Sequence, residues 1–131
     1  MRLIPMMAML GLGAAAACTP MAPGMAQTGG GRACFFVDQV RSFSSPDGRT
    51  VYVRTGSNEV FALRTMGCSN VDWSQEIGIA RARGGGSSIC SSMDAVLYVP
   101  DLPGGRRTCA VTDLRRLTDA ELAALNDRDR P

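Results

Sequence analysis

Histidine and lysine are both missing from this sequence of 131 residues, and all of its fourteen basic residues are arginine. Without histidine there is no imidazole to activate a serine or cysteine nucleophile or to bind a metal ion. Without lysine there is no amine for a Schiff base. An enzyme with this composition would have to rely on carboxylates, hydroxyls, arginine and backbone amides, so the sequence favours a non-catalytic protein.

The net charge is small, and aromatic side chains are few. Fourteen arginines stand against twelve acidic residues, which leaves a formal net charge of +2. A nucleic-acid-binding protein carries a strong, clustered excess of positive charge, so we expect no nucleic-acid partner. No motif indicates a cofactor or a metal site.

The N-terminus has the pattern of an export signal. One arginine, Arg2, precedes an apolar run from Leu3 to Ala17 that ends in small residues. This run is too short to span a bilayer, which takes roughly twenty residues. A charged start, a short apolar stretch and a small-residue exit are typical of a secretory signal, so residues 1–17 are predicted to be a signal peptide.

Two cleavage sites compete. Three alanines precede Cys18, which resembles the lipobox of bacterial lipoproteins, although Ala15 stands where that motif usually has leucine, valine or isoleucine. The alternative is ordinary cleavage after Ala26. The first site is favoured and predicts lipidation of Cys18 and an outer-membrane lipoprotein facing the periplasm. The second predicts a soluble periplasmic protein.

The remaining chain reads as one small domain. Residues 18–33 are rich in proline, glycine and alanine and are predicted to be a flexible tether. Residues 34–126 form the predicted domain, and residues 127–131 a disordered tail. A domain of this size is marginal from its core alone, so disulfide bonds would supply a large share of its stability.

Four cysteines remain once Cys18 is set aside: Cys34, Cys68, Cys90 and Cys109. They are enough for two disulfides, which persist in an oxidising compartment. Four cysteines allow three pairings. The pairing Cys34–Cys109 with Cys68–Cys90 is favoured, because the first and last strands meet if the sheet closes.

Short strands separated by turns predict a mainly β domain. Residues 50–54 alternate in polarity and form a predicted hairpin with residues 59–64, and further strands are expected at 77–80, 95–99 and 108–114. Thr118 and Glu121 make a capping box, which predicts one short helix from about Thr118 to Asn126. We expect five or six antiparallel strands curled toward a small barrel or sandwich.

A set of short motifs is spread over the whole predicted domain. These motifs are Cys34, Thr50–Arg54, Cys68, Asp72-Trp73-Ser74, Ile77-Gly78-Ile79, Ser87-Ser88-Ile89-Cys90, Asp94-Ala95, Val99-Pro100, Cys109-Ala110-Val111-Thr112 and Leu117-Thr118. With these motifs the chain resembles a family of small exported bacterial proteins that carry a signal peptide or lipobox, four domain cysteines and no assigned function. The resemblance covers nearly the whole domain and implies export and a shared fold, but no catalytic residue.

Two segments are candidate binding surfaces. The stretch from Arg81 to Ser88 contains Arg83, three successive glycines and Ser87; it is either a flexible surface loop or a nest of backbone amides for an anion. Trp73 is either a core side chain, which the scarcity of aromatic residues favours, or an exposed anchor for a ligand or partner.

These observations favour a non-catalytic envelope protein that binds another envelope protein or component, with an inhibitor of an envelope hydrolase as one form of that function. Its membrane contact would be a lipid anchor at Cys18 alone. The alternative is a carboxylate-dependent periplasmic hydrolase. That function needs two acids facing each other across a cleft, and the spacing of Asp72, Glu76 and Asp94 does not indicate such a pair.

Overall fold

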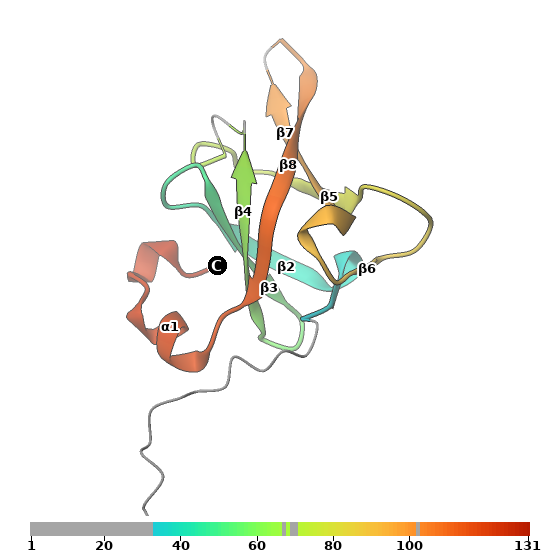
Figure 1. Cartoon of the computed structure of the whole chain (residues 1–131). Coiled ribbons are helices and arrows are strands. Elements are labelled where there is room, and N and C mark those ends of the chain that lie inside the picture. The colour runs from blue at the N-terminus through green and yellow to red at the C-terminus, as the bar shows by residue number, and fades with distance from the viewer. Residues whose placement is uncertain (1–32, 67, 69–70, 102) are drawn as a thin grey trace, which may run out of the picture. The chain divides into compact units, whose positions relative to one another are not determined.

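The computed structural model describes residues 33–66, 68, 71–101 and 103–131 (Figure 1). The described residues belong to one compact unit. The predicted signal peptide, Cys18, the alternative cleavage site after Ala26 and the predicted tether up to residue 32 lie outside the described residues.

Six strands form an antiparallel sheet that curls into a half-barrel, in the order β2-β3-β4-β8-β7-β5, and a separate two-stranded ladder joins β1 to β6. The fold class is therefore the mainly β architecture that the sequence predicts, although the sheet stays open. The strands are β1 (Phe35–Phe36), β2 (Val40–Ser44), β3 (Thr50–Thr55), β4 (Val60–Met66), β5 (Gly78–Arg81), β6 (Ser88–Ile89), β7 (Ala95–Asp101) and β8 (Gly105–Arg116).

The hairpin of β3 and β4 has the position predicted from the sequence. Alternate residues of β3 are buried, because one face of this strand packs on the core and the other is partly open to solvent. In β4 the first four residues are buried on both faces of the sheet. Phe61 and Leu63 belong to the main core, whereas Val60 and Ala62 belong to a second, smaller cluster.

Strand β8 connects the two halves of the sheet. Its C-terminal part pairs with β4 and its N-terminal part with β7 (Figure 1). The register with β4 shifts between Arg64 and Thr65, at a bulge or irregularity. Such irregularities bend a strand and increase its twist, which suits a curled sheet.

The main core combines the sheet with the segments that lie outside it. Phe35 of β1, Ile89 of β6 and Val71 of the segment after β4 are buried in the same cluster as the inward side chains of the sheet. The rings of Phe35 and Phe61 lie 5.0 Å apart between centroids. The ladder of β1 and β6 therefore shares one core with the half-barrel.

Helix α1 (Asp119–Ala124) begins at the predicted capping box, in which the side chains of Thr118 and Glu121 each accept a hydrogen bond from the other residue's backbone N–H. It supplies Leu122 to the small cluster of Val60, Ala62 and Leu117, so it packs against that second face of β4. Helix formation ends at Ala124, two residues before the predicted end.

The last residues differ from the predicted disordered tail. Asp127–Asp129 form a short 3₁₀ helix, η3. The Ser44 hydroxyl donates to the carbonyl of Asp129, and Arg54 Nε donates to the carbonyl of Pro131 at 2.6 Å. The chain thus returns from α1 toward β2 and β3 (Figure 1).

Two disulfides are present, as the sequence predicts, but the favoured pairing was wrong. The bonds join Cys34 to Cys90 and Cys68 to Cys109. The prediction assumed a closed sheet in which the first and last strands meet. Instead β1 pairs with β6, in a register that sets Cys34 beside Cys90, and Cys68 follows β4 where β4 lies against β8, the strand that carries Cys109.

Candidate functional site

Trp73 is the most exposed large apolar side chain of the described domain, with 82% of its surface accessible. The favoured interpretation of Trp73 as a core residue was therefore wrong. The segment that carries it is anchored on the N-terminal side of Trp73, and a backbone hydrogen bond closes the turn around it. Cys68 is bonded to the buried Cys109, Val71 is 1% exposed, and the backbone N–H of Ser74 donates to the carbonyl of Val71. An anchored segment thus presents an indole ring to solvent.

A polar groove of about 850 Å³ lies beside this segment and is named here the Asp72 groove. Three acids, Asp47, Asp72 and Asp113, line it together with Arg49 and Arg64. Met66, which is 69% exposed, also contributes to the wall. The groove therefore offers both signs of charge and the apolar side chain of Met66, and one of its acids, Asp72, directly precedes Trp73 in the sequence.

The turn before β3 forms one wall of the Asp72 groove. Gly48 has a φ of +67°, and a Cβ added there would lie 3.3 Å from Asp72 Oδ1, so glycine lets the turn approach this carboxylate closely. Asp47 accepts hydrogen bonds from the backbone amides of Arg49 at 2.9 Å and Thr50 at 2.6 Å. The carboxylate of Asp47 therefore stabilises the turn through these two hydrogen bonds.

Partial burial raises the pKa of Asp47, but the hydrogen bonds from the amides of Thr50 and Arg49 outweigh it, and the pKa lies below its ordinary value. Asp47 is consequently ionised at neutral pH. A general acid must instead hold its proton near the working pH, so this carboxyl group is unsuited to that role.

A second groove, of about 330 Å³, lies between β2 and the residues that lead into β5, and is named here the edge groove. Its walls carry Val40 and Phe43 from β2, and Ile77 and Ile79 from the other side. All four side chains are partly buried against the main core. Arg41 and Glu76 add one charge of each sign.

The glycine-rich loop between β5 and β6 is organised by Arg81. The Arg81 guanidinium donates to the carbonyl of Gly85 at 3.1 Å and lies 3.9 Å from Asp94 Oδ1. Gly84 and Gly86 have positive φ values of 74° and 111°, which permits the tight path. Arg81 therefore closes this loop on itself.

The carboxyl group of Asp94 is engaged locally. The Ser91 hydroxyl donates to Asp94 Oδ2 at 2.8 Å, and this bond is the main reason that the pKa of Asp94 is lowered, with the Arg81 charge adding to the effect. Of the remaining sequence candidates, Arg83 and Ser87 are exposed. Ser88 belongs to β6, and its hydroxyl lies 3.4 Å from Cys90 Sγ.

The candidate residues thus fall on two surface segments. Trp73 lies on the segment between the two grooves, since Asp72 lines one groove and Glu76 the other. The other four residues, Arg81, Arg83, Ser87 and Ser88, belong to the glycine-rich loop and its two flanking strands.

The three acids considered for hydrolysis are distributed over three places. Asp72 lines the Asp72 groove, Glu76 lines the edge groove, and Asp94 pairs with Ser91 and Arg81. Within the described residues, no group of three histidine, cysteine, aspartate or glutamate side chains is placed to hold a metal ion. Asp113, which joins Asp72 in one groove, escaped the sequence analysis, because strand pairing alone brings β8 to that place.

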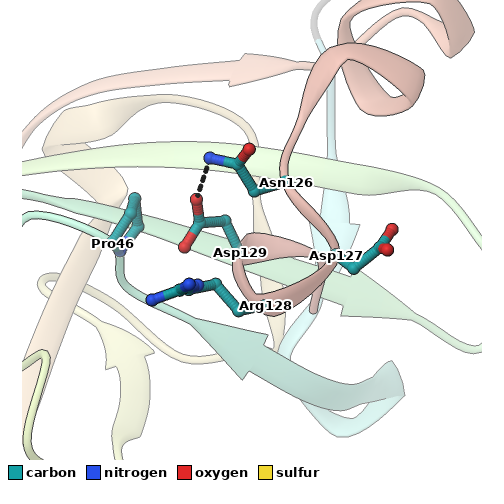
Figure 2. A pocket seen from close by; sticks show the side chains of 5 residues that line it. All are labelled: Pro46, Asn126, Asp127, Arg128 and Asp129. Atoms are coloured by element: carbon teal, nitrogen blue, oxygen red, sulfur yellow. Dashed lines mark hydrogen bonds between the residues drawn. The ribbon is translucent and has the colours of Figure 1, made fainter.

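A third hollow, of about 620 Å³, lies at the C-terminal end and is lined by Pro46 and residues 126–129 (Figure 2). Asn126 donates to Asp129 Oδ2 across it at 3.1 Å. Sequence reasoning missed this hollow because it treated residues 127–131 as a tail. All the residues of η3 are at least partly exposed, and the hollow is a surface depression.

The fold and these surfaces define a small β protein with two disulfides, an open sheet and a projecting tryptophan. The chain belongs to the family of unknown function DUF6491, whose profile matches residues 1–131. The sequence-based resemblance to a family without assigned function is thereby confirmed. No curated protein and no solved structure matches the chain. No helix in the described part of the chain has the length and apolar character needed to cross a membrane.

Proposed function

We propose that the protein is a non-catalytic binding or accessory protein of the bacterial cell envelope, which binds another envelope protein or component through the surface around Trp73. The observation that carries this proposal is the 82% exposure of an indole ring on an anchored segment. Tryptophan is usually well buried, and it is enriched among the few residues that dominate binding energy at interfaces.

The anchoring of the segment supports the proposal on energetic grounds. Binding through a mobile loop loses free energy when the loop becomes ordered, whereas a pre-organised segment avoids much of that loss. Val71 and the Cys68–Cys109 bond fix the base of the segment before any partner arrives. The exposed glycine-rich loop supports the finer proposal that the partner is an envelope hydrolase that the protein inhibits.

Affinity capture from envelope extract tests the role of Trp73. The wild-type protein, Trp73→Ala and Met93→Ala are immobilised in parallel, because Met93 is 77% exposed on a different segment and serves as a matched control. We expect quantitative mass spectrometry to find at least one envelope component that wild type and Met93→Ala retain equally and that Trp73→Ala retains at least about tenfold less. Equal recovery by all three proteins would refute the proposal.

The proposed location is the outer membrane, with a lipid at Cys18. Two disulfides in the domain support an oxidising compartment. Mass spectrometry of membrane-extracted protein should find a mature N-terminus at residue 18 with the mass of diacylglycerol added. A soluble protein that starts at Gln27 would contradict lipidation and indicate the alternative cleavage after Ala26.

The Asp72 groove supports a second candidate function, a carboxylate-dependent hydrolase. Asp72 and Asp113 line the same groove, and Arg64, whose backbone pairs with Asp113 in the sheet, lies with them. Incubation of the wild-type protein with envelope polysaccharide and envelope peptides would detect this activity, and Asp72→Asn should abolish it. Turnover that survives in Asp72→Asn and Asp113→Asn would exclude the groove as its source.

A further inference from the structure

The two edges of the half-barrel border one groove. Among the residues that the structure describes, β2 pairs only with β3 and β5 only with β7, because each of these strands stands at an end of the sheet order. The edge groove is lined by residues of β2, by residues 75–77, which precede β5, and by Ile79 of β5. An unpaired strand edge presents a row of backbone donors and acceptors, and natural proteins cover, shorten or interrupt such edges.

The direction of the free backbone groups of β5 follows from its ladder with β7. The N–H of Ala82 donates to the carbonyl of Asp94 at 2.8 Å, one position beyond the pair of Arg81 and Ala95. In an antiparallel ladder, hydrogen-bonded and non-hydrogen-bonded pairs alternate. Ala80 and Gly78 therefore bond to β7, whereas the N–H and C=O of Ile79 point to the open edge.

The side chains along the edge groove are apolar. Val40 and Phe43 on one side, and Ile77 and Ile79 on the other, remain partly exposed although they pack against the main core. Covering them would remove further apolar surface from water, which is favourable. The edge groove thus combines an apolar lining with a strand edge at which the N–H and C=O of Ile79 have no backbone partner in the described part of the chain.

We propose that the edge groove binds one extended segment of a partner protein, which adds to the sheet as a strand antiparallel to β5. This inference rests on the proposed function and specifies the partner's chemistry. The backbone of the segment pairs with Ile79, and its alternate side chains are apolar and face the lining. Addition of an extended peptide to an exposed sheet edge is a recurring mode of recognition, in which backbone bonds supply affinity.

Charge complementarity adds a feature to the segment. Glu76 precedes β5 on one wall and Arg41 stands on β2, and neither side chain takes part in an ion pair within the described residues. A segment antiparallel to β5 has its C-terminal end near Glu76. We therefore expect a basic residue at that end of the segment.

The chain's own N-terminal region is a poor occupant. The residues immediately before the described domain include Pro20, Pro23 and three successive glycines, Gly29 to Gly31. Proline cannot donate to a ladder, and both residue types are depleted in strands. A partner segment is the occupant to which the proposal commits, and a second copy of this chain is an outcome that the experiment detects.

A labelled peptide tests the proposal on the full chain in mild detergent. The probe is a fluorescent peptide of alternating valine and threonine that ends in lysine, with a version that ends in glutamate for comparison. We expect saturable binding of the lysine probe, followed by fluorescence anisotropy. Ile79→Pro should weaken binding at least about tenfold, because it removes the outward N–H, while the bonds of Gly78 and Ala80 to β7 persist.

Ile79→Val is the matched control, since it keeps the N–H and the apolar character, and it should bind the probe within about threefold of wild type. Glu76→Arg should reverse the preference between the lysine and glutamate probes. Unchanged near-ultraviolet circular dichroism and disulfide maps would establish that Ile79→Pro is folded. If Ile79→Pro unfolds, the test of the inference is whether Glu76→Arg reverses the preference between the lysine and glutamate probes.

The inference would be overturned if wild type did not bind the lysine probe, or if wild type and folded Ile79→Pro bound it equally. Concentration-dependent dimers of wild type that Ile79→Pro abolishes would also overturn it and identify a second copy as the occupant. Failure of the proposed function is seen separately, because Trp73→Ala changes capture from extract but leaves binding of the probe in the edge groove unchanged.

Discussion

Leu97 and Trp73 are two large apolar residues whose substitutions separate packing from binding. Leu97 is fully buried in β7, opposite Ile79 and Cys109 of the neighbouring strands, whereas Trp73 is 82% exposed. We expect Leu97→Ala to lower the free energy of unfolding by about 2–5 kcal/mol, because it removes buried methyl groups and leaves a cavity. Trp73→Ala should change it by less than about 0.5 kcal/mol.

Urea unfolding with the disulfides intact measures both values. A loss of several kcal/mol in Trp73→Ala would contradict its assignment to a binding surface, because that loss would indicate packing that the exposed position does not provide. The same variant must be compared in the capture experiment, where its effect is expected to be large. The pair of measurements therefore distinguishes a surface residue with a binding role from a structural one.

Single residues also mark the limit of the sequence analysis. The scarcity of aromatic residues favoured Trp73 as core, yet aliphatic side chains and Phe35 and Phe61 account for the core. The composition of a chain indicates how much apolar surface it can bury, but it does not indicate which segment passes through the core. Val71, two residues before Trp73, takes the buried position of this segment, and Trp73 is therefore left exposed to solvent.

At the scale of secondary-structure elements, alternation and capping predicted most of the fold. The hairpin of β3 and β4, the strands β5, β7 and β8, and the start of α1 follow from local residues alone. The ends were less predictable. Strand β7 continues through Pro100, although proline has no N–H to donate to a ladder. Strand β5 pairs with β7 only as far as Tyr98. The nitrogen of Pro100 faces the side of β7 that lies beyond the end of β5, so the strand loses no hydrogen bond there.

The capping box of α1 gives a prediction for pH. The Thr118 amide donates to Glu121 Oε2 at 2.8 Å, and this bond, with the Arg115 guanidinium at 2.6 Å from Oε1, holds the pKa of Glu121 below its ordinary value. A carboxyl group whose folded pKa is lowered stabilises the fold fully above its unfolded pKa. That contribution disappears as the pH falls through the folded value.

The Glu121→Gln variant isolates the charge, because glutamine still accepts the capping hydrogen bond. We compare hydrogen exchange of the Leu122 amide, which donates to the Thr118 carbonyl, in wild type and variant at each pH. Wild type should be better protected at pH 7, and the ratio of the two rates should approach one between about pH 5 and pH 3. A ratio that stays constant with pH would contradict the role of the ionised carboxylate.

At the scale of the whole molecule, one disulfide joins the two strands of the small β1–β6 ladder to each other, and the other ties the Trp73 segment to β8 of the half-barrel. They close interlaced loops with sequence separations of 56 and 41 residues. Sequence reasoning predicted four paired cysteines but not their partners, since pairing depends on which strands lie side by side. The crossover that places β8 between β4 and β7 brings Cys109 to Cys68, and no local pattern encodes that order.

The two bridges differ in their surroundings, and this difference predicts the order of their reduction. Cys34 is exposed and Cys90 partly so, whereas Cys68 is 6% and Cys109 0% exposed. A reductant attacks a disulfide sulfur directly, so access governs the rate. We expect a mild reductant to open Cys34–Cys90 first and to leave Cys68–Cys109 intact until the domain unfolds.

Alkylation with mass spectrometry at successive times measures the order, and the Cys34→Ser/Cys90→Ser double variant is the control. In that variant the remaining bridge should resist the reductant as it does in wild type.

Each bridge constrains a loop long enough to contribute about 4 kcal/mol in the chain-entropy model, so either double variant should lose stability of that size. Only the Cys68→Ser/Cys109→Ser variant should also lose capture of the envelope partner, because Cys68 anchors the segment that presents Trp73. Retention of capture in that variant, with the domain still folded, would contradict the argument that pre-organisation of the Trp73 segment supports binding.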